Sequence, residues 1–247
     1  MTTRELINKV LRGLRQFSMI IDSGTTSTTD DYLLMILQFV NEAKEEIEES
    51  GWAWQALRQT VTVTVAASTL EYDITIAGAA DVDSNDRSRL LYDNIIGSEG
   101  FRLADCAVPQ VFDVTDSSES RLSEVPLEKM ERWHFTDDDQ TGKPSHFAIY
   151  QDGDSLRMKV YPTPDGTYTL KARLYIPQTE LLNTDLTTEL SIPSRPVWMK
   201  ALLKANAERG SELGAPDGLL ATQYLDAHGF AVANEQSPDD ETVILAR

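Results

Sequence analysis

Residues that could perform chemistry are present in this chain, but their spacing matches no established site. Asp81, Asp83 and Asn85 have the spacing of the first ligands of a calcium-binding loop. Such a loop requires glycine at its sixth position and an acidic residue at its twelfth, where this chain has Asp86 and Tyr92. The calcium template therefore fails, and we expect an ordinary solvated loop.

The remaining candidate ligands are isolated from one another along the chain. His134, His146 and His228 form no H-x-x-x-H pair, so we expect surface histidines or hydrogen-bonded core histidines. The acidic run 137–139 could hold a hard cation, although runs of like charge are usually solvated. Cys106 is the only cysteine, which excludes an intrachain disulfide and a thiolate metal cage. We therefore expect no cofactor.

Motifs of the common enzyme classes are missing from the sequence. It contains no G-x-S-x-G elbow, no Walker loop and no strand-linked G-x-G-x-x-G. Forty acidic residues make chance carboxylate pairs inevitable, so a pair by itself indicates nothing. We expect a protein that is not an enzyme. Two alternatives stay open: a carboxylate-dependent hydrolase with one acidic cleft, and a carbohydrate- or receptor-binding module with a groove of surface aromatic residues.

The charge balance limits the partners. Against 40 acidic residues the chain has 22 Lys and Arg, for a net charge of −18. Phosphate-backbone binding needs clustered cations, so nucleic-acid binding is not expected as the main activity. An acidic wall could instead let DNA pass without sticking, and solubility alone explains the charge equally well. The chain has no apolar run of about 20 residues and no signal-peptide core, so we expect no membrane span and synthesis in the cytoplasm.

Apolar residues recur with helical spacing near the N-terminus. Thr2 and Glu5 predict a capping box for a first helix, and 31–50 predicts a second, with Thr28 and Thr29 among its candidate caps. In the second helix, the polar segment NEAKEEIEES is expected to face solvent. The two apolar stripes comprise Leu6, Val10, Leu14 and Phe17, and Leu33, Ile36, Leu37, Val40, Ala43 and Ile47.

Helical spacing returns near the C-terminus. Ser194 is a predicted cap, Pro196 opens the helix, and the helix should end around 210–214. A last helix is predicted to start at Pro216. The two apolar stripes comprise Val197, Trp198, Ala201, Leu202 and Ala205, and Leu219, Leu220, Tyr224, Ala227 and Phe230.

Between these helices the apolar period changes to two, which is typical of strands. A short helix is predicted over 126–135, and the lack of long crossover helices favours an antiparallel sheet. Within 159–177, Pro162 and the pair Asp165-Gly166, with its expected positive φ, predict a hairpin with a stiffened corner. The predicted strands are 60–65, 70–75, 89–96, 110–115, 145–150, 156–161 and 167–176.

These elements predict an α+β fold in which one helical bundle is formed from both ends of the chain. We expect N-terminal bundle helices in 1–57, an inserted antiparallel β region in 58–190, and completing helices in 191–235. An extended C-terminal arm, 236–247, should follow.

The order of the pieces resembles a known family. The stretch VYPTPDGTYTLKARLYIPQTELLNTD, the helix IPSRPVWMKALLKANAERG and the helix end EEIEESGWAWQAL are similar to head-to-tail adaptor proteins of tailed bacteriophages. The resemblance is to those related to podovirus tail tubular protein A, over roughly residues 1–235. It implies a bundle plus a β domain and a dodecameric ring in the virion, beneath the portal protein. Such a ring extends the DNA channel without sequence-specific binding and docks the tail or nozzle below, and no catalytic residues accompany it.

The C-terminal arm is the predicted protein interface. Val243, Ile244 and Leu245 place three adjacent apolar side chains at a chain end, where β-branched residues suit an extended strand. We expect the arm to dock on another subunit, the portal, by strand addition, with Arg247 anchoring the tip. The alternative is a frayed tail or one folded back on its own bundle.

Overall fold

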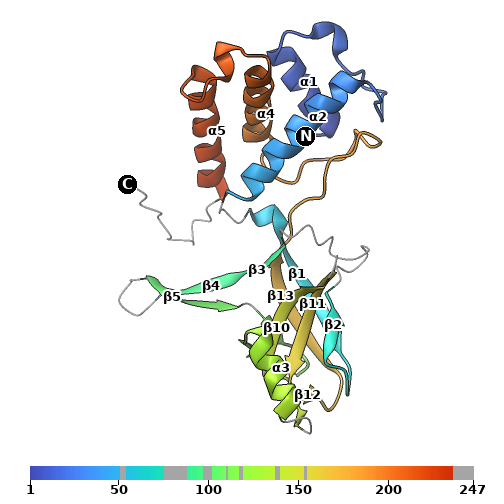
Figure 1. Ribbon diagram of the computed structural model, residues 1–247, viewed down its shortest axis with the longest axis vertical. Helices are drawn as coiled ribbons and strands as arrows, with labels where there is room; N and C mark the ends of the chain where they lie inside the picture. Colours follow the sequence, from blue (N-terminus) through green and yellow to red (C-terminus); the bar gives the residue numbers. More distant parts are fainter. Residues whose placement is uncertain are drawn as a thin grey trace. The chain divides into compact units, whose positions relative to one another are not determined.

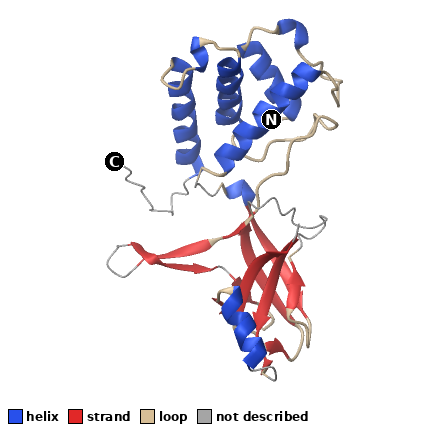
Figure 2. Cartoon of the chain, in the orientation of Figure 1, coloured by secondary structure: helices blue, strands red, loops and turns tan. Residues whose placement is uncertain are grey.

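The computed structural model describes residues 1–50, 54–74, 88–96, 102–109, 111–116, 119–136, 140–152 and 155–235. The chain forms two compact units: a helical unit, Met1–Leu57 with Pro177–Arg247, and a β unit, Arg58–Ile176 (Figure 1). Figure 2 shows the strands gathered in the β unit together with one helix. The predicted α+β fold, with strands inserted between N- and C-terminal helices, is confirmed.

The described residues of the helical unit form four α-helices, and the central one, α4, packs against the other three. The predicted packing of 31–50 against 195–210 is confirmed, and Val40, Ile47, Val197 and Leu202 are buried as expected. The helices are α1 (Thr3–Gly13), α2 (Asp31–Glu48), α4 (Ser194–Glu208) and α5 (Leu219–Glu235). Short 3-10 turns are η1 (Phe17–Met19), η2 (Gln55–Leu57) and η3 (Glu212–Gly214).

The starts of the helices follow side-chain chemistry only in part. The capping box of Thr2 and Glu5 is present at α1. At α2 the cap is Asp30, whose carboxylate accepts two amide hydrogen bonds of the first turn at 3.0 and 3.1 Å, instead of Thr28 or Thr29. An ionised carboxylate at this position also interacts favourably with the helix dipole.

Helix α1 ends earlier than its apolar pattern suggests. Arg15 adopts a left-handed conformation with φ 59°, and Gln16 donates its amide proton to Leu11 across the helix end. The chain therefore leaves the helical path, and Phe17, predicted to belong to the apolar stripe, is 65% exposed. Arginine is unusual at this position, which usually requires glycine.

Helix α4 begins and ends through its backbone. Pro193 is the N-cap residue and makes no side-chain cap, so the predicted cap Ser194 already lies inside the helix. At the other end Gly210, with φ 65°, allows the same type of reversal as in α1. Gly214 lies close to the backbone of the last turns of α4, since an added Cβ would lie 2.2 Å from the Ala207 backbone nitrogen.

The predicted stripe of α5 is buried only in part: Ala227 is buried, and Leu220 and Tyr224 are half-buried. Ala221, Ala227 and Ala231 are the buried residues, whereas Leu219 is 72% and Phe230 69% exposed. Small side chains let α5 lie close to α4, and the two ends of the predicted stripe, Leu219 and Phe230, lie exposed on the flank of the helix. The helix begins at Leu219, later than the predicted start.

The β unit contains two larger sheets. The first has the order β1-β13-β6-β7 with β3 also paired to β13, and the second has the order β2-β11-β10-β8. Their strands are β1 (Arg58–Val65), β2 (Glu71–Asp73), β3 (Arg89–Leu90), β6 (Val111–Asp113), β7 (Ser120–Arg121), β8 (Ser123–Glu124), β10 (His146–Asp152), β11 (Ser155–Tyr161) and β13 (Tyr168–Tyr175). Most pairs are antiparallel as predicted, but β8 pairs with β10 in parallel.

Two smaller strand pairs and one helix are the remaining elements among the described residues of the β unit. β12 (Thr163–Pro164) pairs in parallel with β9 (Thr141–Gly142), and β4 (Tyr92–Ile96) pairs antiparallel with β5 (Arg102–Pro109). Strand β5, which contains the only cysteine, was not predicted. Helix α3 (Leu127–Thr136) packs against β10. Its bounds differ by one residue from those of the short helix predicted over 126–135.

One apolar cluster is shared by the two larger sheets, so they pack face to face. The alternation predicted for β1 is confirmed, with Val61, Val63 and Val65 buried and the intervening threonines exposed. Further members are Leu170, Ala172 and Leu174 of β13 and Phe147, Met158 and Val160 of β10 and β11.

The predicted hairpin over 159–177 is wrong. Strands β11 and β13 belong to different sheets, so the segment with cis Pro162 carries the chain from one sheet to the other. Gly166 is outside the left-handed region, where the expected turn would have placed it. Because the two sheets share a core, apolar residues on both strands are buried without the strands pairing.

Candidate interaction surfaces

The residues predicted to form a protein interface, Val243, Ile244, Leu245 and Arg247, lie outside the described residues. The structure does describe where the segment begins. Glu235, the last residue of α5, accepts a hydrogen bond from the Gln55 amide on its carboxylate at 3.1 Å, and one from the Gln55 side chain on its carbonyl at 2.8 Å. The last turn of α5 is therefore held to η2.

The residues considered for metal binding are not brought together in the described part of the chain, which contains no group of three or more His, Cys, Asp or Glu able to hold a metal. His134 and His146 contact the aromatic rings of Tyr161 and Trp133, respectively. His228 lies against Trp54, and burial, with Lys200 nearby, lowers the pKa of its imidazole. The predicted loops at 81–86 and 137–139 lie outside the described residues.

A buried ion pair anchors the irregular segment 177–190 to α2. Lys44 and Glu48 are fully buried and lie 3.7 Å apart. The Lys44 ammonium donates to the backbone carbonyls of Gln178 and Thr179 at 2.5 and 3.0 Å, and Glu48 accepts from the Gln178 amide. The sequence placed both residues on a solvent-exposed face. They are buried because the backbone of 177–190 crosses that face and requires donors and acceptors.

Further hydrogen bonds hold segment 177–190 against the helices. The sequence pattern had grouped this segment with the strands. Asn41 donates to the Leu181 carbonyl and accepts from the Leu181 amide, both at 3.0 Å. At the other end of the segment the Thr3 amide donates to the Thr188 carbonyl at 2.9 Å. Side chains of α2 and the backbone at the start of α1 thus provide hydrogen-bond partners for the backbone of 177–190, which is not part of a strand.

The cations between α2 and α4 are already used within the unit. Lys204 lies 3.0 Å from Glu42 and 2.5 Å from Glu46, and Lys200 also pairs with Glu46. Burial opposes the ionisation of Glu46, but hydrogen bonds from the two lysines outweigh it and hold its pKa below the ordinary value. The same carboxylates raise the pKa of Lys204 against the opposing effect of burial.

The outer face of α5 and the adjoining turn form an exposed acidic and apolar surface, here termed the α5 edge. It comprises Leu213, Asp217, Leu219, Asp226 and Phe230, all exposed. The sequence contains no Lys or Arg from 210 to 246. That gap in basic residues was the available signal for this surface, whereas helical periodicity assigned Leu219 and Phe230 to the buried stripe.

A basic surface lies on α1, here termed the α1 edge. It comprises the exposed residues Lys9, Arg12 and Arg15. Beside them, a hollow of about 410 Å³ is lined by Met1, Glu5 and Asn8 together with Lys9 and Arg12. In the described part of the chain, no acidic side chain forms an ion pair with the three cations, and the Lys9 ammonium lies 5.5 Å from the centre of the Trp198 ring.

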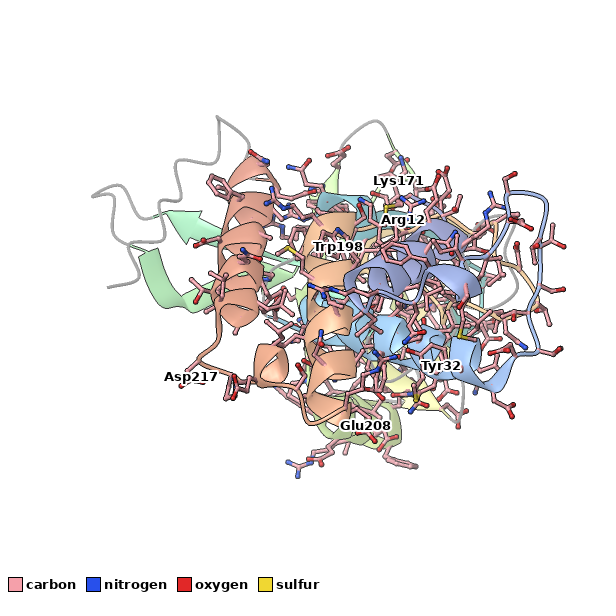
Figure 3. All side chains as sticks on the ribbon, turned by 90° about the horizontal axis from the view of Figure 1, so that it is seen from above. Arg12, Tyr32, Lys171, Trp198, Glu208 and Asp217 are labelled. Carbon is pink, nitrogen blue, oxygen red and sulfur yellow. The ribbon has the colours of Figure 1, made fainter. Side chains whose placement is uncertain are left out.

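The two edges lie on different sides of α4. In Figures 1 and 3, α1 and α5 stand on either side of α4, and Figure 3 labels Arg12 on the α1 side and Asp217 beside α5. The helical unit therefore presents a basic surface and an acidic, partly apolar surface in different directions. None of the described helices is long and apolar enough to cross a membrane.

Comparison with known proteins identifies the family. The family model described as SU10 adaptor protein matches residues 1–239, which cover both units. No curated protein matches the chain. Because the match extends over nearly the whole chain, it covers the helices at both ends as well as the inserted strands. The chain thus belongs to the SU10 adaptor protein family, a family of bacteriophage adaptors.

Proposed function

We propose that the chain is a structural head-to-tail adaptor of a tailed bacteriophage. Copies form a ring, a dodecamer by the resemblance to podovirus tail tubular protein A, beneath the portal protein at the head–tail junction of the virion. The ring extends the DNA channel and docks the tail or nozzle protein below. The observation that carries the proposal is the match of the SU10 adaptor model to residues 1–239.

The adaptor family favours a protein that is not an enzyme, and no specific observation favours either alternative function. The described residues contain no group of three potential metal ligands. In the β unit Trp133 is half-buried and packs against His146 and Tyr161, an arrangement typical of a small aromatic core rather than of a sugar-binding groove. We therefore propose no second function.

Co-assembly with the portal protein tests the proposed role. The full chain and the portal of the same phage are co-expressed, isolated by a tag on the portal and imaged by negative-stain electron microscopy. We expect the portal to capture the chain and a ring of added density to appear on one face of the portal. Failure of the portal to capture the full chain under assembly conditions would overturn the proposal.

The C-terminal arm is proposed as the portal-binding element, with Val243, Ile244 and Leu245 as its apolar contacts and Arg247 as its anchor. Deleting 237–247 should leave the thermal melt of the chain unchanged and abolish capture by the portal. A control variant with the three apolar residues replaced by serine keeps the length of the arm and should also lose capture. Unchanged capture by both variants would contradict this assignment.

An acidic channel wall is the remaining part of the proposal. The net charge of −18 would then serve DNA passage, because a wall of carboxylates repels the phosphate backbone. A ring structure should show acidic side chains outnumbering basic ones on the inner wall. A neutral or basic wall would indicate that the charge serves solubility.

A further inference from the structure

The α5 edge combines exposed large apolar side chains with exposed carboxylates. Its exposed leucine and phenylalanine side chains alternate with acidic residues, while the buried face of the helix uses alanines. Leu219 and Phe230 lie on the same side of the helix, because eleven positions correspond to about three turns. Asp226 lies between them along that side and carries an exposed carboxylate. A partner for this surface therefore offers both cationic groups and a hollow for apolar side chains.

The α1 edge of the same unit has those properties. The hollow of about 410 Å³ beside Lys9 and Arg12 provides room for a projecting side chain. Glu5, which also lines it, is held by its capping bond to the Thr2 amide at 3.0 Å. Lys200 and Lys204 of α4 pair with acidic residues of α2 in their own copy, whereas the cations of the α1 edge have no acidic partner among the described residues.

Arg15 adds an observation that local stability does not explain. It occupies a left-handed position, φ 59°, that closes α1 and that glycine occupies at far lower conformational cost. The corresponding position after α4 is Gly210. Keeping an exposed arginine at such a position opposes fold stability, which suggests that its charge is used outside the unit.

We propose that copies of this chain associate head to tail, with the α5 edge of one copy docked on the α1 edge of the next. Asp226 and Asp217 face the cations Lys9, Arg12 and Arg15, and the exposed apolar side chains of α5 enter the hollow on α1. This inference rests on the proposed ring and names the surfaces through which it forms.

The charges of the two edges favour this head-to-tail arrangement over a symmetric dimer. Pairing two α5 edges would bring Asp217 and Asp226 against their own copies, and pairing two α1 edges would oppose Lys9 and Arg12 to themselves. Both arrangements place like charges together, which is unfavourable. Since the two edges lie on different sides of α4, contact between unlike edges leaves one of each free. Such heterologous contacts continue from copy to copy and close into a ring when the rotation permits.

Complementary charge reversal tests the proposal in the full chain. The α1 variant carries Lys9→Glu with Arg12→Glu, and the α5 variant carries Asp217→Lys with Asp226→Lys. Assembly is measured by sedimentation and electron microscopy, with and without the portal protein. We expect each variant alone to lose association at least tenfold. An equimolar mixture should recover it, because each variant retains one native edge and the reversed edges complement one another.

Two controls separate association from folding. Lys171→Glu with Arg173→Glu makes the same change in charge on exposed residues of the β unit and should leave assembly unchanged. Arg15→Gly should keep or raise the melting temperature while weakening association, a combination that a purely structural role for Arg15 does not produce. The wild-type association should also weaken as salt is raised.

The outcomes distinguish this inference from the proposed function. Rings that form normally from both variants would overturn the head-to-tail contact and leave the adaptor role intact. Loss of assembly by each variant without recovery in the mixture would also overturn it. A wild-type chain that forms no ring with the portal would instead overturn the proposed function, and the inference with it.

Discussion

The helical unit and the β unit differ in how far their buried ion pairs are exposed to water. In the helical unit both members of the Lys44–Glu48 pair are fully buried. In the β unit Asp113 is 1% exposed, but its partner Lys143, at 2.7 Å, is 41% exposed. The first pair is thus shielded from water, whereas the second reaches the surface through its lysine.

The difference follows from how the backbone amides and carbonyls of each unit are hydrogen-bonded. Strand ladders satisfy the amides and carbonyls of the β unit, so its core can be almost wholly apolar. The segment 177–190 has no such ladder, and its carbonyls lie over α2, where Lys44 and Asn41 bind them. In the helical unit the buried charge of Lys44 therefore marks irregular backbone that α2 binds.

The largest effect is expected from Lys44→Met. It removes the ammonium that lies 3.7 Å from the buried Glu48 carboxylate and that donates to two backbone carbonyls, which should cost about 3–5 kcal/mol. Urea unfolding followed by the helical circular dichroism signal measures the loss, and hydrogen exchange should rise first in 177–190. A matched control, Lys44→Met with Glu48→Leu, removes both charges and should recover a substantial part of the loss. Equal losses in the two variants would mean that the buried charge is not the cause.

Leu202→Ala tests the apolar contribution to the same unit and should cost about 2–5 kcal/mol, because it opens a cavity among α1, α2 and α4. The cavity would adjoin Gly13, where an added Cβ would lie 2.6 Å from the Leu202 side chain. Gly13→Ala should therefore destabilise the wild type, and in the Leu202→Ala background it should restore stability. Chemical denaturation of the wild type, the two single variants and the double variant gives the coupling free energy between the two sites, and strict additivity would contradict the contact.

Asp113→Asn addresses the β unit. Burial of Asp113 opposes its ionisation, but hydrogen bonds from Lys143 and Thr115 outweigh it and hold its pKa below the ordinary value. The resulting stability is present above the unfolded pKa, about 3.9, and is lost as pH falls through the lower folded pKa. The variant should lose about 1–3 kcal/mol at neutral pH and lack this acid dependence.

Hydrogen exchange of β6 and β13 against pH measures the effect on the β unit separately. Asp116→Asn is the matched control, since Asp116 is 72% exposed and lies 3.8 Å from the same lysine. It should change exchange little. An unchanged acid dependence in Asp113→Asn would show that other carboxylates control the acid stability of the β unit.

The smallest predicted effect is an increase in the stability of the helical unit. Gly229→Ala in α5 should stabilise the helical unit by about 1 kcal/mol, because an added Cβ meets nothing within 4 Å and alanine has the higher helix propensity. Gly214→Ala is the opposite control, since its Cβ would collide with the Ala207 backbone. Thermal melts should move in opposite directions for the two variants, and a destabilised Gly229→Ala would reveal a contact on the outer face of α5.

Several features of this protein were determined by local sequence alone. The helical period of the terminal segments and the alternation of Val61, Val63 and Val65 predicted the element types correctly, because each pattern reports which side chains share a face. The missing motifs favoured a protein that is not an enzyme, and the adaptor family supports that prediction. The C-terminal arm, with Val243 to Leu245, stays a prediction.

Other features were decided only by the tertiary structure. Periodicity does not tell which apolar residues meet a neighbour, so Ala227 of the predicted α5 stripe is buried whereas Phe230 of the same stripe is exposed. It also does not tell that 177–190 crosses α2, which buries Lys44. Nor does a proline turn show that its two strands enter different sheets. In each case the deciding contact joins segments far apart in the chain, and its free energy depends on shape and unsatisfied backbone groups that no local pattern encodes.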